Sequence, residues 1–146
     1  MIIRLLKSND YDDIYTLWLS TPNMGLNDID DTREGIVKYL KRNPNTCFVA
    51  EKNGCIIGVI LSGHDGRRGF IYHTAVAADE QQQGIGSALV DAAMTALERE
   101  GISKVALVAM SKNDKGNAFW EKQRFITRPD LVYRNKAITE MKAIDT

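Results

Sequence analysis

The stretch Gln81-Gln82-Gln83-Gly84-Ile85-Gly86-Ser87-Ala88-Leu89 joins an apolar segment to a long amphipathic one. Upstream, residues 70–77 have the composition of a strand, and downstream the apolar residues recur at three- and four-residue spacing, which is typical of a helix. We therefore expect a helix over residues 84–100. The first backbone N–H groups of a helix lack intrahelical partners and lie at the positive end of its dipole, so this turn predicts a site for an anion such as phosphate.

Composition narrows the class of protein. The 146 residues suit a single domain over 1–146, and the 19 basic and 19 acidic residues argue against a nucleic-acid binder, which normally has a basic face. Two cysteines and two histidines are too few ligands for a structural zinc site, so we expect no metal. The chain has no apolar run of membrane-spanning length and no signal peptide, which predicts a soluble cytoplasmic protein without a membrane partner.

The predicted elements follow the order strand, two helices, three strands, long helix, strand, short helix and two strands. Asn53-Gly54 indicates an antiparallel hairpin, and the long helix should connect two parallel strands at residues 70–77 and 104–110. Residues 125–128 and 131–138 predict a closing hairpin, through which two copies could pair as a homodimer. We expect an α+β fold in α/β/α layers, with a mixed, mostly antiparallel sheet of about seven strands and helices on both faces.

The aliphatic run at residues 104–110 is nearly continuous, which predicts a strand buried on both faces. The glycines of the opening stretch have two readings. Gly84 and Gly86 could simply permit a tight strand-to-helix turn, or they could admit a ligand to the backbone. A dinucleotide-binding turn needs a small third residue where this chain has Leu89, and no Gly-Lys-Ser or Gly-Lys-Thr is present for a Walker A loop.

The wider pattern Gln81-x-x-Gly84-x-Gly86 resembles the acetyl-CoA signature of the GNAT superfamily of N-acetyltransferases, written as Arg or Gln, two residues, Gly, one residue, Gly or Ala. The predicted order of elements is that of the GNAT fold, and Asn113-x-x-Gly116-x-x-Phe119-Trp120 with Phe125 is similar to its second cofactor motif. The resemblance covers nearly the whole chain. It implies an acyltransferase that moves an acetyl group from acetyl-CoA to a primary amine of a small molecule or a protein N-terminus.

By this resemblance, the CoA pyrophosphate would lie against the backbone N–H groups of residues 81–87. The backbone of Thr74 and Val76 would hold the pantetheine amides, on a strand edge left free because the two parallel strands diverge. Asn113 would hydrogen-bond the CoA arm, although an Asn before a helix can equally cap a turn. The implied cofactor-binding residues are Thr74, Val76, Gln81, Gln82, Gln83, Gly84, Ile85, Gly86, Ser87, Asn113, Gly116, Phe119 and Trp120.

The chain departs from the family pattern in its acid-base residues. Trp120 stands where many members carry a Tyr that acts as the general acid. Phe70 and Val108 stand where relatives carry a Glu that acts as the general base. The indole N–H of Trp is a poor proton donor. Tyr72 lies two residues from Phe70 and so on the same face of its strand, which makes it a substitute. The candidate catalytic residues are Tyr72, Tyr133 and His64.

His73 directly follows Tyr72, so the alternation of a strand predicts that the two side chains lie on opposite faces. The imidazole of His73 is then either a packing group or a substrate contact. The polar loop over residues 27–31 could orient an acceptor amine, or could only cap a helix and stay solvated, and its acidic character favours a cationic acceptor. The candidate substrate-binding residues are Asn27, Asp31, Asp65 and His73.

Two other functions compete with acetyl transfer. The missing acid-base residues fit a CoA-binding module without catalysis, which would bind acetyl-CoA but release no thiol with any amine. A dinucleotide-binding domain would instead bind nucleotides with no need of a pantetheine arm.

Overall fold

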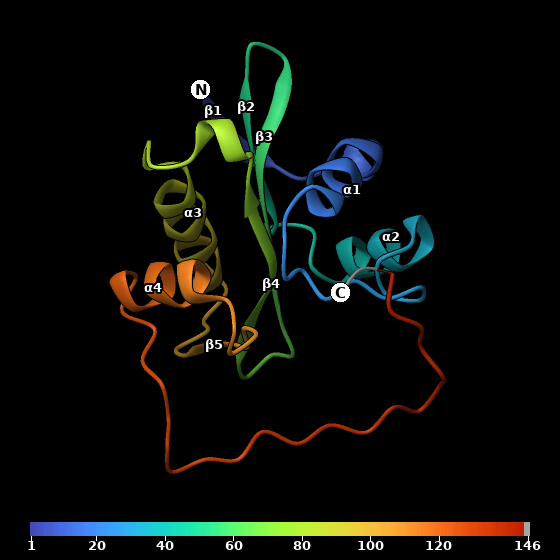
Figure 1. The fold of residues 1–146 in the computed structure, drawn as a ribbon, viewed down its shortest axis with the longest axis vertical. Helices are drawn as coiled ribbons and strands as arrows, with labels where there is room; N and C mark the ends of the chain where they lie inside the picture. The colour runs from blue at the N-terminus through green and yellow to red at the C-terminus, as the bar shows by residue number, and fades with distance from the viewer. Residues whose placement is uncertain (145–146) are drawn as a thin grey trace.

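The computed structural model describes residues 1–144 and has a five-stranded sheet between two layers of helices (Figure 1). The strands lie in chain order, β1 to β4 antiparallel and β5 parallel to β4. Helices α1 and α2 cover one face of the sheet, and α3 and α4 lie on the other (Figure 1). The elements are β1 (Ile2–Leu5), α1 (Tyr11–Leu19), α2 (Arg33–Arg42), β2 (Phe48–Lys52), β3 (Cys55–His64), β4 (Gly69–Val76), α3 (Ile85–Arg99), β5 (Val105–Leu107) and α4 (Asp114–Lys122).

Local sequence accounts for the turns and helix ends. Asn53 and Gly54 have φ angles of 53° and 78°, the left-handed values that a two-residue hairpin requires. The hydroxyl of Thr32 accepts a hydrogen bond of 3.1 Å from the N–H of Gly35 and caps α2. These observations confirm the predicted hairpin and show that α2, the second of the predicted helices, begins directly after Thr32.

The sheet separates two apolar clusters. One contains Ile14 and Trp18 of α1, and the other contains Leu89 and Ala93 of α3, all of them fully buried. Helix α3 packs closely on the sheet at Gly58, where an added Cβ would lie 3.0 Å from Leu89 Cδ1. The α+β fold and its α/β/α layers are therefore as predicted.

The closing hairpin is the part of the fold that was predicted wrongly. Residues 126–141, here called the arm, form no strand and instead run as an extended segment from the end of α4 toward the side of α2 (Figure 1). The sheet consequently has five strands in place of the expected seven or so. The prediction of burial for residues 104–110 also fails, because Val108 is 57% exposed. Apolar composition indicates that residues need a partner, but it does not say where that partner lies.

A bulge in β4 corrects the expected directions of two side chains. Val59 pairs with Ala75 and Leu61 pairs with Tyr72, so two residues of β4 stand opposite one of β3. His73 lies in this bulge with a φ of 25°. Its ring packs on Trp18, with 5.1 Å between ring centroids, so His73 faces the α1–α2 side together with Tyr72 rather than the opposite side.

Candidate active site

The strands β4 and β5 are paired only at one end. Their ladder stops at the pair Ile71–Leu107, and beyond it the edge of β4 that faces β5 is free, as the resemblance implied. One backbone carbonyl at the far end of this edge is occupied, since Val76 O accepts a hydrogen bond of 3.1 Å from the side-chain amide of Gln81. An extended amide-bearing ligand could therefore pair with β4 in the manner of an added strand.

The turn after β4 has the geometry of an anion site. Gln82 and Gly84 have φ angles of 64° and 80°, and α3 begins at Ile85. The N–H of Ala88 makes a helical hydrogen bond of 3.0 Å to Gly84 O, so the three preceding N–H groups lie in the first helical turn, before that bond. An added Cβ at Gly84 would meet nothing within 4 Å, so the left-handed backbone, not crowding, explains this glycine.

Gly86 has an explanation that differs from both readings of the sequence. An added Cβ there would lie 2.9 Å from Cε1 of Phe119, so the missing side chain makes room for α4 to pack on α3. Phe119 in turn meets Trp120 edge to face, and Trp120 meets Phe125 in the same way, with centroids 5.0 and 5.3 Å apart. The Asn113 side chain accepts a 3.0 Å hydrogen bond from the N–H of Gly116, which is the capping role.

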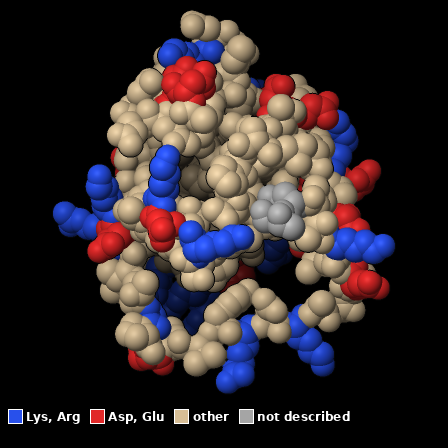
Figure 2. Space-filling view, in the orientation of Figure 1, with Lys and Arg blue, Asp and Glu red and all other residues tan. Residues whose placement is uncertain are grey.

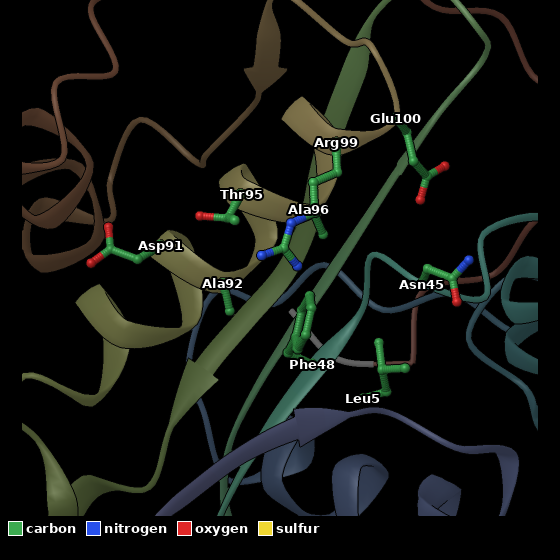
Figure 3. Close-up of a pocket in the computed structure, with 9 residues that line it drawn as sticks. All are labelled: Leu5, Asn45, Phe48, Asp91, Ala92, Thr95, Ala96, Arg99 and Glu100. Atoms are coloured by element: carbon green, nitrogen blue, oxygen red, sulfur yellow. The ribbon is translucent and has the colours of Figure 1, made fainter.

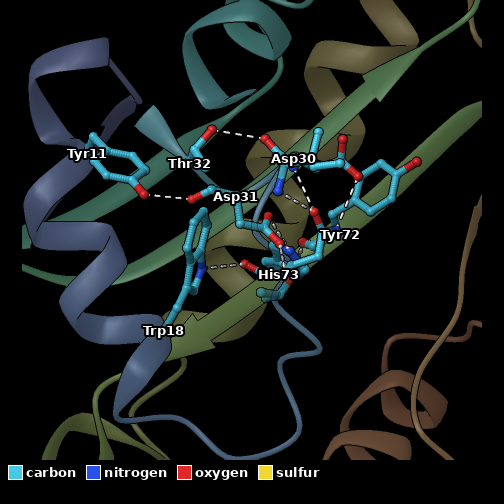
Figure 4. Close-up of polar contacts among 10 residues, drawn as sticks. Tyr11, Trp18, Asp30, Asp31, Thr32, Tyr72 and His73 are labelled. Atoms are coloured by element: carbon cyan, nitrogen blue, oxygen red, sulfur yellow. Dashed lines mark hydrogen bonds and ion pairs between the residues drawn. The ribbon is translucent and has the colours of Figure 1, made fainter. Parts of the chain in front are cut away.

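A histidine–aspartate pair lies on the α1–α2 side of β4 (Figure 4). His73 Nε2 is 2.7 Å from Asp31 Oδ1, and the Asp31 side chain is only 3% exposed. The other oxygen of Asp31 accepts a 2.8 Å hydrogen bond from the N–H of Asn27. A carboxylate only accepts hydrogen bonds, so Nε2 of His73 is the donor to Asp31, and the neutral imidazole with this tautomer has its lone pair on Nδ1.

The backbone around this pair is also anchored. Trp18 Nε1 donates a 3.2 Å hydrogen bond to His73 O, and the hydroxyl of Tyr11 donates a 2.6 Å hydrogen bond to Asp31 O (Figure 4). Both donors belong to α1. The pair is thus held between β4 and the loop before α2, which fixes the direction of the imidazole.

Tyr72 is the second polar group on this side of β4. Its ring contacts Phe70 and Tyr39, with centroids 4.7 and 5.9 Å away, and the side chain is still partly open to solvent. Burial raises the pKa of the Tyr72 hydroxyl, with smaller contributions from Tyr133 and Asp30. The hydroxyl therefore remains protonated at neutral pH and can act as a proton donor.

The remaining candidates lie apart from this pair. His64 Nε2 is 2.7 Å from Glu100 Oε1 and its Nδ1 accepts the N–H of Gly66, so both ring nitrogens are used at the β3–β4 turn. Asp65 accepts two backbone N–H groups in the same turn, and these hydrogen bonds lower the pKa of its carboxyl. Tyr133 is exposed on the arm, and it does not contact the pair but lies near enough to Tyr72 to raise the pKa of that hydroxyl.

The hollow shown in Figure 3 is not this site. It measures about 630 Å³ and is lined by residues of α3, β1 and β2, among them Phe48 and Arg99. Tyr72 and His73 instead face α1 and α2. Within residues 1–144, no group of three or more His, Cys, Asp or Glu side chains could hold a metal ion, and no helix could span a membrane.

Comparison with known proteins identifies the family. The sequence model of the family described as Acetyltransferase (GNAT) family matches residues 11–125. A protein named acetyltransferase from Pectobacterium atrosepticum is 32% identical over 140 residues, which cover 96% of this chain and 97% of that protein. The chain belongs to the GNAT family. A second acetyltransferase, from Sodalis glossinidius, is 29% identical over the same length, 96% of this chain and 97% of that one.

Solved GNAT structures share the fold. Ard1 from Thermoplasma volcanium has a TM-score of 0.76 at 22% identity and covers 86% of this chain and 82% of its own. The PaiA N-acetyltransferase from Thermoplasma acidophilum, in complex with coenzyme A, gives 0.73 at 15% identity over 84% and 87%. An aminoglycoside acetyltransferase from an uncultured soil sample, in complex with sisomicin, gives 0.71 at 23% over 94% and 96%.

Family membership confirms the fold and the enzyme class that the resemblance implied. As a GNAT protein, this chain is an acyltransferase of the acetyl-CoA-dependent class. GNAT acetyltransferases act on amine acceptors.

Proposed function

We propose that this protein transfers the acetyl group of acetyl-CoA to a primary amine of a cationic small molecule, with His73 as the general base. The observation that carries the proposal is the hydrogen-bonded pair of His73 and buried Asp31, which lies on the strand whose edge is free beside β5. A neutral imidazole held by a carboxylate is a base suited to neutral pH.

The residues of this chain fit the cosubstrate. The first turn of α3 presents unpaired N–H groups behind a left-handed turn at Gln82 and Gly84, an arrangement suited to the pyrophosphate. The edge of β4 at Thr74–Val76 is not paired with β5, and it suits the pantetheine amides once the Gln81 side chain releases Val76 O. Bound there, acetyl-CoA would supply the thioester that the amine attacks.

Each catalytic step can be assigned to a residue. Nδ1 of His73 would accept a proton from the acceptor ammonium, and Asp31 would stabilise the resulting imidazolium. The free amine forms a C–N bond with the acetyl carbonyl carbon while the C–S bond breaks. The departing CoA thiolate takes a proton from Tyr72, whose raised pKa keeps its hydroxyl protonated. The nitrogen of the new amide loses its second proton, which restores the Tyr72 hydroxyl, so the products are the amide, the CoA thiol and one proton on His73.

Acidic side chains on the same side support a cationic acceptor. Asp28 and Asp30 lie in the loop that carries Asp31, and Asp30 is close enough to raise the pKa of Tyr72. An ammonium group would be attracted by these carboxylates. The aminoglycoside acetyltransferase that shares the fold was solved with the aminoglycoside sisomicin, which supports a small polycation as the acceptor class; a protein N-terminus is the alternative.

The test is thiol release from acetyl-CoA with a panel of aminoglycosides, polyamines and short peptides. His73→Gln should lower kcat at least about 100-fold, because it removes the base. Its dissociation constant for acetyl-CoA, measured by calorimetry, should stay within about twofold, since the side chain does not form the phosphate turn. His64→Gln is the matched control and should keep full turnover.

Two results would contradict the proposal. Wild-type protein that binds acetyl-CoA but releases no thiol with any amine would favour the alternative of a CoA-binding module. Full turnover by His73→Gln would be consistent with the acetyltransferase activity but would show that His73 is not the general base.

A further inference from the structure

The hollow shown in Figure 3 lies between α3 and the strands β1 and β2, and no step of the proposed reaction uses it. Its volume of about 630 Å³ is within the range of small-molecule sites. Leu5 and Phe48 come from the two strands, and Ala92 and Ala96 come from the helix. These four side chains give the hollow an apolar wall.

The hollow exists because α3 directs its larger apolar side chains toward other strands. An added Cβ at Gly58 of β3 would lie 3.0 Å from Leu89 Cδ1, and one at Gly69 of β4 would lie 3.2 Å from Leu97 Cδ1. Toward β1 and β2 the apolar side chains of α3 are alanines, whose methyl groups are too short to fill the space. The gap above Phe48 is therefore left open.

A basic side chain is directed into this hollow. The guanidinium of Arg99, in the last turn of α3, points between Ala92 and Phe48 (Figure 3). Among residues 1–144 no hydrogen bond or ion pair engages this guanidinium, although the negative end of the helix dipole lies close by. A guanidinium carries five N–H donors in a planar fork that fits a carboxylate. The hollow thus combines an apolar wall with one unpaired anion-binding group.

The acidic side chains of the hollow do not neutralise Arg99. Glu100 Oε1 lies 2.7 Å from His64 Nε2, and both Glu100 and Asp91 point away from the guanidinium (Figure 3). Elsewhere the charges are mixed: 19 basic residues balance 19 acidic ones, and Figure 2 shows the two signs interspersed over one face of the molecule. An anion would therefore be drawn to a specific group rather than to the general surface charge.

We propose that this hollow is a second ligand site, which binds a small amphipathic carboxylate. The apolar body of the ligand lies against Leu5 and Phe48, and its carboxylate accepts charge-assisted hydrogen bonds from Arg99. An uncharged ligand would leave the guanidinium desolvated without a partner, and a cationic one would be repelled by it. Arg99 lies thirteen residues beyond Gly86, about 20 Å along a helix, so the site is separate from the phosphate turn. This inference is independent of the proposed function.

The first test uses octanoate, which joins an apolar chain to one carboxylate. Calorimetry should give a dissociation constant below about 1 mM for octanoate and at least about tenfold weaker binding of octylamine, which carries the opposite charge. Arg99→Gln should raise the dissociation constant for octanoate at least about tenfold, because the charge-assisted hydrogen bonds are lost. Arg67→Gln removes the same charge in the turn between β3 and β4 and should change this constant less than about twofold.

The second test locates the bound octanoate. Ala92→Leu fills the hollow without changing its charge and should also raise the dissociation constant at least about tenfold. The Ala92 side chain is partly exposed, so circular dichroism should show a folded variant. In NMR spectra of the wild-type chain, octanoate should shift the amide signals of residues around Phe48 and Arg99, and saturating CoA should not displace it.

Four results would overturn the proposal. They are the absence of octanoate binding, equal affinity for octylamine, an affinity that Arg99→Gln leaves unchanged, and displacement of octanoate by CoA. Shifts of amide signals confined to the exposed apolar residues of the arm would also overturn it, because they would show non-specific adsorption of the alkyl chain.

Discussion

At the scale of single residues, the proposed general base His73 also has an unusual backbone conformation. Its φ of 25° is rare for a residue with a side chain, and such backbone strain persists where the surroundings impose it. Here Trp18 holds the carbonyl and Asp31 holds the ring. Alternation along β4 predicted that His73 would face away from Tyr72, and one extra residue in the strand reverses that outcome.

Tyr72→Phe tests the proton donor of the proposed reaction. Loss of the hydroxyl should lower kcat at least about tenfold and leave the acetyl-CoA dissociation constant unchanged. Because the pKa of Tyr72 is raised above its ordinary value near 10, its deprotonation should not reduce wild-type turnover below about pH 10. Tyr39→Phe is the matched control, since the Tyr39 hydroxyl is buried without a hydrogen-bond partner among residues 1–144. Equal turnover by Tyr72→Phe and wild type would exclude this role.

At the scale of elements, α3 performs two tasks with one short stretch. Its N-terminus presents N–H groups behind the left-handed Gly84, and its second residue, Gly86, leaves space for Phe119 of α4. The two glycines that looked equivalent in the sequence therefore act differently. Gly86→Val would displace Phe119 and so would not report on phosphate binding alone, which makes another residue the better probe.

Ser87→Asp is that probe. The helix dipole stabilises a carboxylate in the first turn. This carboxylate can also accept the 2.8 Å hydrogen bond that Gln123 donates to Ser87, so the fold should be unaffected. The same charge should repel the pyrophosphate and raise the dissociation constant for acetyl-CoA at least about tenfold, as measured by calorimetry. Thr95→Asp introduces the same charge in the last half of α3 and should change affinity less than about twofold. Unchanged affinity in Ser87→Asp would remove this turn from the cosubstrate site.

At the scale of the whole molecule, the sheet is the shared wall of two apolar clusters. Trp18 fills one face and Leu89 the other, and neither side chain is exposed to solvent. Since both clusters use residues of β3, we expect residues 1–146 to unfold as a single domain. The active-site candidates lie on the face of Trp18, whereas the first turn of α3 lies on the face of Leu89, so β4 has to connect the two halves of the proposed reaction.

Leu89→Ala should lower the free energy of unfolding by about 3 kcal/mol, because it leaves a cavity between α3 and the sheet. Met94→Ala, on the outer side of the same helix, should cost less than about 1 kcal/mol. Denaturant unfolding followed by tryptophan fluorescence and by circular dichroism, at equal protein concentrations, should give coincident transitions in both variants. Separate transitions for the two probes would mean that the two faces fold as independent units.

The sequence by itself determined the fold class, the antiparallel hairpin at Asn53-Gly54, the long helix and the turn at its start. These features depend on local periodicity and on residues such as Gly84 that few others can replace. It also predicted that residues 104–110 would pair in parallel with residues 70–77, which β5 and β4 confirm, but the burial of that run on both faces and the closing hairpin at residues 125–138 were predicted wrongly. Apolar composition requires burial without specifying whether the cover comes from the same chain or from another.

Only the tertiary structure decided which polar groups meet. Asp31 and His73 are 42 residues apart, and no local pattern links a loop carboxylate to an imidazole in a strand. Their contact depends on the bulge in β4, which adds one residue to the strand and turns His73 toward α1. Contacts between residues that are distant in the sequence depend on how the core packs. Their distances cannot be read from the spacing of residues along the chain.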